Sequence, residues 1–181
     1  MQDRGIMKIE IVDNFLSDYW ADTYVKIFDG KQGKGGRNFP WFFSNDLNGV
    51  ERMGNYYFNH QVILNYKVQS DQWLPIFEPL ISTIGISFNN VWRLKVNLYP
   101  RTQRRVHHST HIDYQPNSGL RTCLYYVNTN NGVTIFDGKK TVKSKKNRAI
   151  LFDGSNKHHS TTSTDCNYRC SINIDYNGKR V

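Results

Sequence analysis

Hydrophobic positions in the first half of the chain recur at helical spacing in two stretches. The first follows Ser17 and the second follows Ser70, and their apolar members are Trp20, Tyr24, Ile27 and Phe28, then Trp73, Phe77, Leu80, Ile81 and Ile84. This spacing predicts two amphipathic helices, one from Ser17 to about Phe28 and one from Ser70 to Gly85, with a serine cap at each start. Between them, residues 30–55 are punctuated by Gly and Asn, which predicts a loop or a short hairpin.

From Val91 onward the apolar runs become short and are separated by turn signals. The pattern predicts strands at residues 91–99, 110–114, 120–128, 133–136, 141–143, 148–152, 158–162 and 169–176, with turns at Asn131-Gly132, Asp137-Gly138 and Asp153-Gly154. Strands in this number favour a mainly β protein with flanking helices and a double-stranded β-helix (jelly-roll) core. We expect a single domain over residues 1–181, in which 1–90 give helical and loop support and 91–181 form the core that carries the site.

Two of the predicted strands alternate between an apolar and a polar face. The polar faces consist of Arg93, Lys95, Asn97 and Tyr99 in the first strand and of Arg169, Ser171, Asn173 and Asp175 in the last. Successive side chains on a strand point in opposite directions, so each set shares one side of the sheet. We expect these polar faces to line the inside of the roll, where polar groups need a ligand or one another.

The composition narrows the class of protein. Apolar residues make up 38% and charged residues 22% of the chain, as in ordinary folded domains. No apolar run approaches the roughly 18 residues of a membrane helix, and the first residues lack a secretory signal, so no membrane partner is expected. The cysteines (Cys123, Cys166 and Cys170) have no paired metal spacing and are interpreted as reduced thiols of a cytoplasmic protein.

The formal net charge of +9 raises the question of an acidic partner. The basic residues gather at 101–105 and 139–148, where turns are also predicted. We interpret them as solvated side chains on turns, because charge without a matching motif does not assign a partner.

The chemistry is concentrated in the motif His111-Ile112-Asp113. Residues two apart on a strand project to the same side, so the imidazole and the carboxylate can reach one point. His158 follows the turn at Asp153-Gly154 and is the predicted third ligand. Two histidines and one carboxylate match the facial triad of non-haem Fe(II) oxygenases. His159 is the alternative third ligand, and only one of these neighbours can serve because they point to opposite faces.

Arg169 stands at the start of the last predicted strand. A buried guanidinium there can hold a carboxylate in a bidentate pair, whereas a surface salt bridge is the commoner fate of an arginine. Among the other histidines, His107 and His108 are expected in a loop at the mouth of the site, and His60 is expected to be structural.

Residues 99–176 resemble the catalytic core of the 2-oxoglutarate oxygenases, especially the prolyl-hydroxylase-like branch. Four pieces match in order: Tyr99-Pro100 ahead of the His-x-Asp motif, the Thr-Cys-Leu-Tyr-Tyr-Val-Asn segment at 122–128, the segments 132–138 and 147–153, and His158 with Arg169. The resemblance covers a little under half of the chain.

The resemblance implies a role for each matched residue. The triad would bind Fe(II), and Arg169 would pair with the distal carboxylate of 2-oxoglutarate, helped by the phenol of Tyr126. Tyr99 would line the same pocket, and Asn173 would contact the cosubstrate. The implied activity is that of a dioxygenase, which uses O2 to hydroxylate a C–H bond while 2-oxoglutarate is decarboxylated to succinate.

The substrate is less closely defined by the sequence. The match at Tyr125-Tyr126-Val127-Asn128 favours a protein or peptide side chain, prolyl first, with a small molecule as the next possibility. Nucleic acid is not favoured, because nucleic-acid demethylases of this superfamily carry a second arginine in an Arg-x-Asn-x-x-x-Arg pattern that residues 169–175 lack. The non-enzymatic alternative is a jelly-roll binding module that lost its chemistry, against which the complete ligand set argues.

Overall fold

The computed structural model describes residues 8–30, 38–45 and 56–178. The strands are β1 Ile9–Asp13, β2 Phe42–Ser44, β3 Tyr57–Leu64, β4 Lys67–Val68, β5 Val91–Pro100, β6 Leu120–Tyr126, β7 Val133–Phe136, β8 Lys140–Lys143, β9 Arg148–Asp153, β10 His158–Ser160 and β11 Tyr168–Asn177. The α-helices are α1 Asp18–Phe28 and α2 Glu78–Ile84, and the 3-10 helices are η1 Asp71–Phe77 and η2 Phe88–Asn90.

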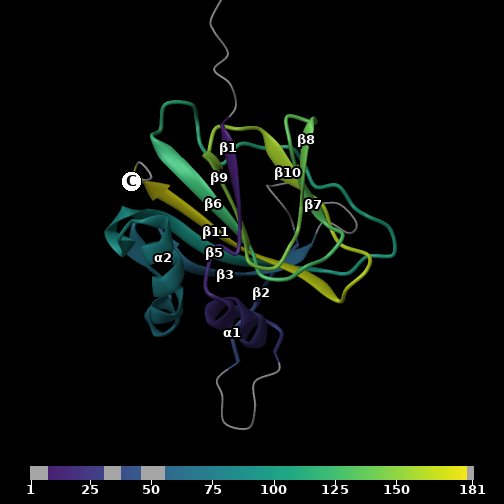
Figure 1. Ribbon diagram of the computed structural model, residues 1–181, viewed down its shortest axis with the longest axis horizontal. Helices are drawn as coiled ribbons and strands as arrows, with labels where there is room; N and C mark the ends of the chain where they lie inside the picture. Colours follow the sequence, from purple (N-terminus) through teal and green to yellow (C-terminus); the bar gives the residue numbers. More distant parts are fainter. Residues whose placement is uncertain (1–7, 31–37, 46–55, 179–181) are drawn as a thin grey trace, which may run out of the picture.

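Two antiparallel sheets form the body of the fold. The larger sheet has the spatial order β1-β9-β6-β11-β5-β3-β2, with β4 paired to β3, and the smaller has the order β10-β7-β8. The smaller sheet lies across from the larger one, while α1 and α2 lie on the other side of the larger sheet (Figure 1). The predicted jelly-roll architecture with flanking helices is therefore confirmed.

The two helical predictions differ in outcome. The helix α1 begins directly after Ser17 as expected, although the serine side chain makes no capping hydrogen bond. The second predicted helix is instead η1 followed by α2, and Ser70 makes no capping bond either. Pro75 lies within η1 and has no N–H to donate, which interrupts a continuous α-helix. Gly85, at φ 81°, ends α2 as predicted.

The first 90 residues contribute more than helical and loop support, so that part of the prediction is wrong. β1 pairs with β9 along five residues, and β3 pairs with β5 in the larger sheet. β3 was missed because polar residues such as Asn59 and Gln61 interrupt its pattern of hydrophobic positions; they pair with Asn97 and Lys95 of β5. Part of the segment predicted as a loop or a short hairpin forms the edge strand β2, and residues 31–37 and 46–55 lie outside the described residues.

Apolar side chains form a separate core on each side of the larger sheet. The bigger core joins the helices to the sheet and includes Tyr24, Phe77, Leu94 and Ile172. A smaller one lies between the two sheets and contains Leu124, Tyr126, Phe136, Val142, Ile150 and Phe152. The rest of the space between the sheets is lined by the polar faces of β5 and β11, as their alternation predicted.

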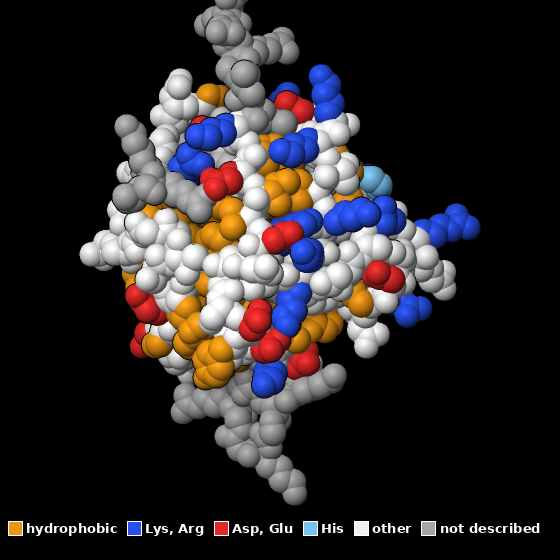
Figure 2. Space-filling view, in the orientation of Figure 1, with side chains coloured by type: hydrophobic (Ala, Val, Ile, Leu, Met, Phe, Trp, Pro, Cys, Tyr) orange, Lys and Arg blue, Asp and Glu red, His pale blue; other side chains and the backbone are white. Residues whose placement is uncertain are grey.

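The basic cluster at residues 139–148 is partly neutralised. Lys145 Nζ lies 2.9 Å from Asp13 Oδ2, Arg148 Nε lies 2.6 Å from Asp13 Oδ1, and Lys146 pairs with Asp22. Figure 2 shows lysine and arginine side chains interspersed with acidic ones on one face. Within the described residues, no helix combines the length and the apolar character needed to cross a membrane.

Candidate metal centre

Three ligand-type side chains meet in the space between the sheets. One possible ligand atom from each of His111, Asp113 and His158 lies within 4.8 Å of the others. The His111 Nε2–Asp113 Oδ1 distance is 3.9 Å and the His158 Nε2–Asp113 Oδ2 distance is 3.6 Å. Two ligands held about 2.1 Å from one ion lie roughly 3–4 Å apart, so this spacing suits a single metal ion. The donor set is that of a facial-triad iron site.

The backbone that brings these ligands together is not the strand predicted at 110–114. The amides of His111 and His158 each donate to the other residue's carbonyl oxygen, at 2.9 Å in both directions, and this pair is an isolated bridge. Gly154 O then accepts from the amides of both Asp113 and Tyr114, at 2.8 and 3.1 Å. Because one carbonyl oxygen accepts hydrogen bonds from two successive amides, the chain bends there and the β-pairing does not continue beyond the bridge.

Each histidine of the triad is oriented by a backbone carbonyl. His158 Nδ1 lies 2.8 Å from Asn156 O, and His111 Nδ1 lies 3.2 Å from Ser109 O. A carbonyl oxygen only accepts, so the proton sits on Nδ1 and Nε2 keeps its lone pair for a metal. Burial, reinforced by His158, lowers the pKa of His111, which favours the neutral imidazole that a metal ligand must be.

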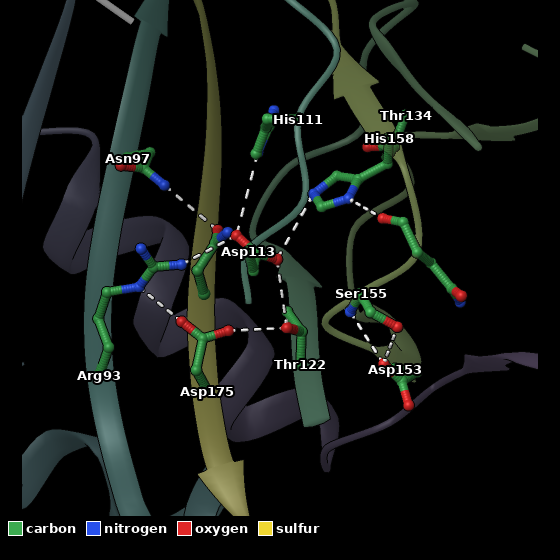
Figure 3. A network of polar contacts seen from close by, with 12 residues as sticks. Arg93, Asn97, His111, Asp113, Thr122, Thr134, Asp153, Ser155, His158 and Asp175 are labelled. Carbon is green, nitrogen blue, oxygen red and sulfur yellow. Dashed lines mark hydrogen bonds and ion pairs between the residues drawn. The ribbon is translucent and has the colours of Figure 1, made fainter. Parts of the chain in front are cut away.

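The carboxylate of Asp113 is held by a buried polar network (Figure 3). Arg93 Nη2 donates to Asp113 Oδ1 at 3.0 Å, and Thr122 Oγ1 donates to Asp113 Oδ2 at 3.2 Å. Both donors also contact Asp175, at 2.5 Å from Arg93 Nε and 2.7 Å from Thr122 Oγ1. Burial raises the pKa of the Asp175 carboxyl, while the guanidinium of Arg93 opposes that rise. Arg93 and Asp175 thus fix the orientation of the metal ligand.

The structure distinguishes between the two neighbouring histidines. His158 is buried and faces Asp113, whereas His159 turns away from it. His159 Nδ1 lies 3.2 Å from Thr110 Oγ1, and its Nε2 lies 3.3 Å from His107 Nδ1. The geometry therefore brings His158, rather than His159, into the triad.

The other histidines are placed as follows. Both His107 and His108 were expected at the mouth of the site. His107 is exposed, but His108 is buried. Its ring stacks on Tyr99 at 4.9 Å, and its Nδ1 lies 2.7 Å from Ser160 Oγ. Burial, together with the nearby charge of Arg169, lowers the pKa of His108 to about 3. His60 is buried, with Nδ1 2.9 Å from Pro40 O, as a structural histidine would be.

Arg169 is 1% exposed and lies between the sheets. Its Nε donates to Ser144 Oγ at 2.9 Å and its Nη2 donates to Thr134 Oγ1 at 3.1 Å. Its guanidinium carbon lies 5.5 Å from the ring centre of Tyr99 and 5.4 Å from that of Tyr126. Among the residues that the structure describes, no carboxylate pairs with it. A buried cation without an anion is costly, so the site suits an anionic ligand.

One cavity of about 70 Å³ connects Arg169 to the triad. Tyr99, Thr134 and Asn173 line it. Tyr126 lies behind Thr134 instead of in the lining, and its hydroxyl donates to Thr134 Oγ1 at 2.7 Å. The residues that sequence reasoning did not single out are Arg93, Thr122, Thr134, Ser144 and Asp175. For Arg93 and Asp175 the signal was present, since both belong to the predicted polar faces.

Solved structures share this fold. An oxidoreductase of the 2OG-Fe(II) oxygenase family from Burkholderia pseudomallei matches with a TM-score of 0.62 at 11% identity, over 95% of this chain and 87% of that one. The fold is that of the 2-oxoglutarate- and Fe(II)-dependent oxygenases. A Trichoplax adhaerens prolyl hydroxylase in complex with a hypoxia-inducible-factor peptide matches with a TM-score of 0.51 at 20% identity, over 93% and 82%.

The same fold also carries other chemistry. A non-haem α-ketoglutarate-dependent epimerase from nogalamycin biosynthesis matches with a TM-score of 0.62 at 10% identity, over 94% of this chain and 78% of that one. No protein-family model and no curated protein sequence matches the chain. At identities this low, the structural matches establish a shared fold only. The reaction must be argued from the residues of the site.

Proposed function

We propose that this protein is an Fe(II)- and 2-oxoglutarate-dependent dioxygenase that hydroxylates a C–H bond and releases succinate. The observation that carries the proposal is one cavity with the three ligand-type side chains at one end and, at the other, a buried arginine that no carboxylate of the described residues pairs with. The two ends of 2-oxoglutarate match the two ends of this cavity. Its α-keto acid group chelates a metal, and its second carboxylate pairs with a guanidinium.

In this proposal, His111, Asp113 and His158 hold Fe(II). The bound iron supplies the redox chemistry by which O2 and 2-oxoglutarate are converted while the substrate is oxidised. The protein orients the reactants: Arg93 and Thr122 fix the Asp113 carboxylate, and the carbonyl partners of both histidines fix their rings. No separate acid–base residue is assigned.

The distal carboxylate of 2-oxoglutarate would be bound by Arg169 and Thr134. Thr134 Oγ1 already accepts hydrogen bonds from Tyr126 and Arg169, so its own proton is available for that carboxylate. Tyr126 thereby acts through Thr134 and through its ring contact with the guanidinium. Tyr99 and Asn173 line the path between the two ends and would contact the cosubstrate.

For the substrate, we propose a prolyl or other side chain of a protein or peptide. The likeness to a peptide-bound prolyl hydroxylase and the sequence resemblance support this class. A small metabolite is the second candidate, supported by the epimerase of the same fold. Nucleic acid is disfavoured because buried Asp175 stands where the demethylase pattern has its second arginine.

Free thiols at all three cysteines support the cytoplasmic location proposed from the sequence.

The proposal is tested by anaerobic titration with Fe(II) and then 2-oxoglutarate, following the metal-to-ligand charge-transfer absorption in the visible. We expect a band in the wild type, no band in His111→Ala, and a 2-oxoglutarate requirement at least tenfold higher in Arg169→Met. Arg101→Met, at an exposed position, is the matched control and should behave as wild type. A folded wild type that gives no band would refute the proposal.

A further inference from the structure

Lys95 extends from the inner face of β5 into the cavity. It is half-buried, and its Nζ donates to Tyr57 Oη at 3.1 Å and lies 5.2 Å from the Tyr57 ring centre. No carboxylate of the described residues pairs with this ammonium group. A hydroxyl and a ring face provide only part of the stabilisation that an anion gives to a partly desolvated cation.

The charges around the cavity leave one positive charge uncompensated. The cations are Arg93, Lys95 and Arg169, and the carboxylates are Asp113 and Asp175. Arg93 is paired with both carboxylates. In the proposed function, Fe(II) and the 2-oxoglutarate dianion cancel each other, and the distal carboxylate is assigned to Arg169. Lys95 is then the cation for which the described residues provide no anion.

A second observation, on the neighbouring inward-facing residue of β5, supports a ligand close to Lys95. Asn97, two residues further along the same face of β5, is 4% exposed and also lines the cavity. Its Nδ2 donates to Asn173 Oδ1 at 3.2 Å, but its Oδ1 has no hydrogen-bond partner within the described structure. A buried amide oxygen left unpaired is costly, so a bound molecule with an N–H or O–H group is expected here.

We propose that Lys95 selects the substrate by pairing with a carboxylate that the substrate carries close to the oxidised carbon. A neighbouring N–H or O–H group of the substrate would donate to Asn97 Oδ1. The inference rests on the proposed function and specifies its substrate: the carboxylate belongs either to a free amino acid or to an acidic residue beside the target in a peptide.

The alternative role for Lys95 is a contact with the metal-bound carboxylate of 2-oxoglutarate. The two roles differ in what the substitution Lys95→Met weakens. If Lys95 serves the substrate, Fe(II) and 2-oxoglutarate titrations of Lys95→Met and wild type should give the same band at the same concentrations. A tenfold loss of 2-oxoglutarate affinity in Lys95→Met would assign the residue to the cosubstrate and overturn the proposal.

Substrate binding is measured on protein loaded with Mn(II) and 2-oxoglutarate, from the paramagnetic broadening of proton resonances of added probes. Two matched pairs separate the two sources of the carboxylate: L-proline against L-prolinamide, and a capped Asp-Pro dipeptide against its Asn-Pro counterpart. We expect wild type to favour the acidic member of at least one pair by about tenfold, as for one charge-assisted hydrogen bond. The pair that responds identifies the source.

The preference should disappear in Lys95→Met, return in Lys95→Arg, and be unaffected in Lys140→Met, an exposed lysine on β8. Equal broadening by acidic and amide probes in wild type, or no broadening by any of them, would refute the inference. Failure of the proposed function is distinguishable, because no charge-transfer band would then form with Fe(II) and 2-oxoglutarate in any variant.

Discussion

Replacing Gly132 by alanine is expected to weaken 2-oxoglutarate binding, although Gly132 would not contact the cosubstrate. A Cβ at this position would lie 2.7 Å from Arg169 Cδ and 2.8 Å from Asn130 Oδ1. Carbon atoms in ordinary contact are about 3.5–4.0 Å apart, so the arginine side chain must move by about 1 Å. Arg169 is the side chain that can give way, because Asn130 Oδ1 is bound to the amide of Gly132 itself, at 2.9 Å.

The magnitude follows from the contacts that this movement disturbs. A hydrogen bond to a charged group contributes about 1.5–3 kcal/mol, and misaligning one of the two that Arg169 would make with a carboxylate forfeits roughly that amount. We therefore expect 2-oxoglutarate affinity to fall about 10- to 100-fold. Overpacking of this kind also lowers the free energy of unfolding by about 1–3 kcal/mol.

The assay is the anaerobic 2-oxoglutarate titration of Fe(II)-loaded protein, with thermal unfolding measured in parallel. Gly138→Ala is the control, because a Cβ there meets no atom within 4 Å while its φ of +66° still strains an alanine. It should lower stability and leave the titration unchanged. If Gly132→Ala is folded and binds 2-oxoglutarate as tightly as wild type, the close approach to Arg169 has no functional role and the reasoning fails.

Three further predictions concern the same interior. Arg93→Met removes the cation shared by Asp113 and Asp175, and should weaken Fe(II) binding about 10- to 100-fold in a metal titration, with Arg101→Met unchanged. Thr134→Val should raise the 2-oxoglutarate requirement about tenfold without affecting Fe(II) binding, because it removes the proposed donor to the distal carboxylate of 2-oxoglutarate. Burial lowers the pKa of His108 to about 3 in the folded protein, whereas an unfolded histidine titrates near pH 6.5. Between these two pH values unfolding therefore takes up a proton. The contribution of His108 to the free energy of unfolding falls by about 1.4 kcal/mol for each pH unit from about pH 6.5 down to about pH 3. His108→Phe should flatten the pH dependence of urea denaturation, and an unchanged slope would contradict that assignment.

The sequence predicted the ligand positions more reliably than the local structure that carries them. His111 and Asp113 converge as expected, yet they lie on a bent segment rather than on a strand. The prediction of a shared face succeeded because an extended backbone places residues two apart on one side, with or without a ladder. The sequence did not predict that the carbonyl oxygen of Gly154 accepts hydrogen bonds from two successive amides, those of Asp113 and Tyr114. This arrangement limits the β-pairing to the single bridge between His111 and His158.

The sequence predicts that Arg93 and Asp175 face inward, but it does not show that they lie beside each other and hold Asp113. Arg93 and Asp175 are opposite each other across β5 and β11, a relation set by sheet register. Thr122 is brought opposite Asp175 by the pairing of β6 with β11. The alternation along each strand shows which residues face inward, but the cross-strand neighbours depend on pairings that turns and bulges decide.

The reciprocal backbone pair between His111 and His158 makes the proposed metal site sensitive to local opening. It is an isolated bridge between a loop and the short strand β10, outside the larger sheet. Separation of these two segments would dismantle the triad while β5 and β11 stay paired, so the site can be lost well below the temperature of global unfolding. A bound ion opposes that opening by about 2.7 kcal/mol at a hundred times its dissociation constant. Iron loading should accordingly slow amide hydrogen exchange at His111 and His158 about a hundredfold, and leave the amides in the middle of β5 nearly unchanged.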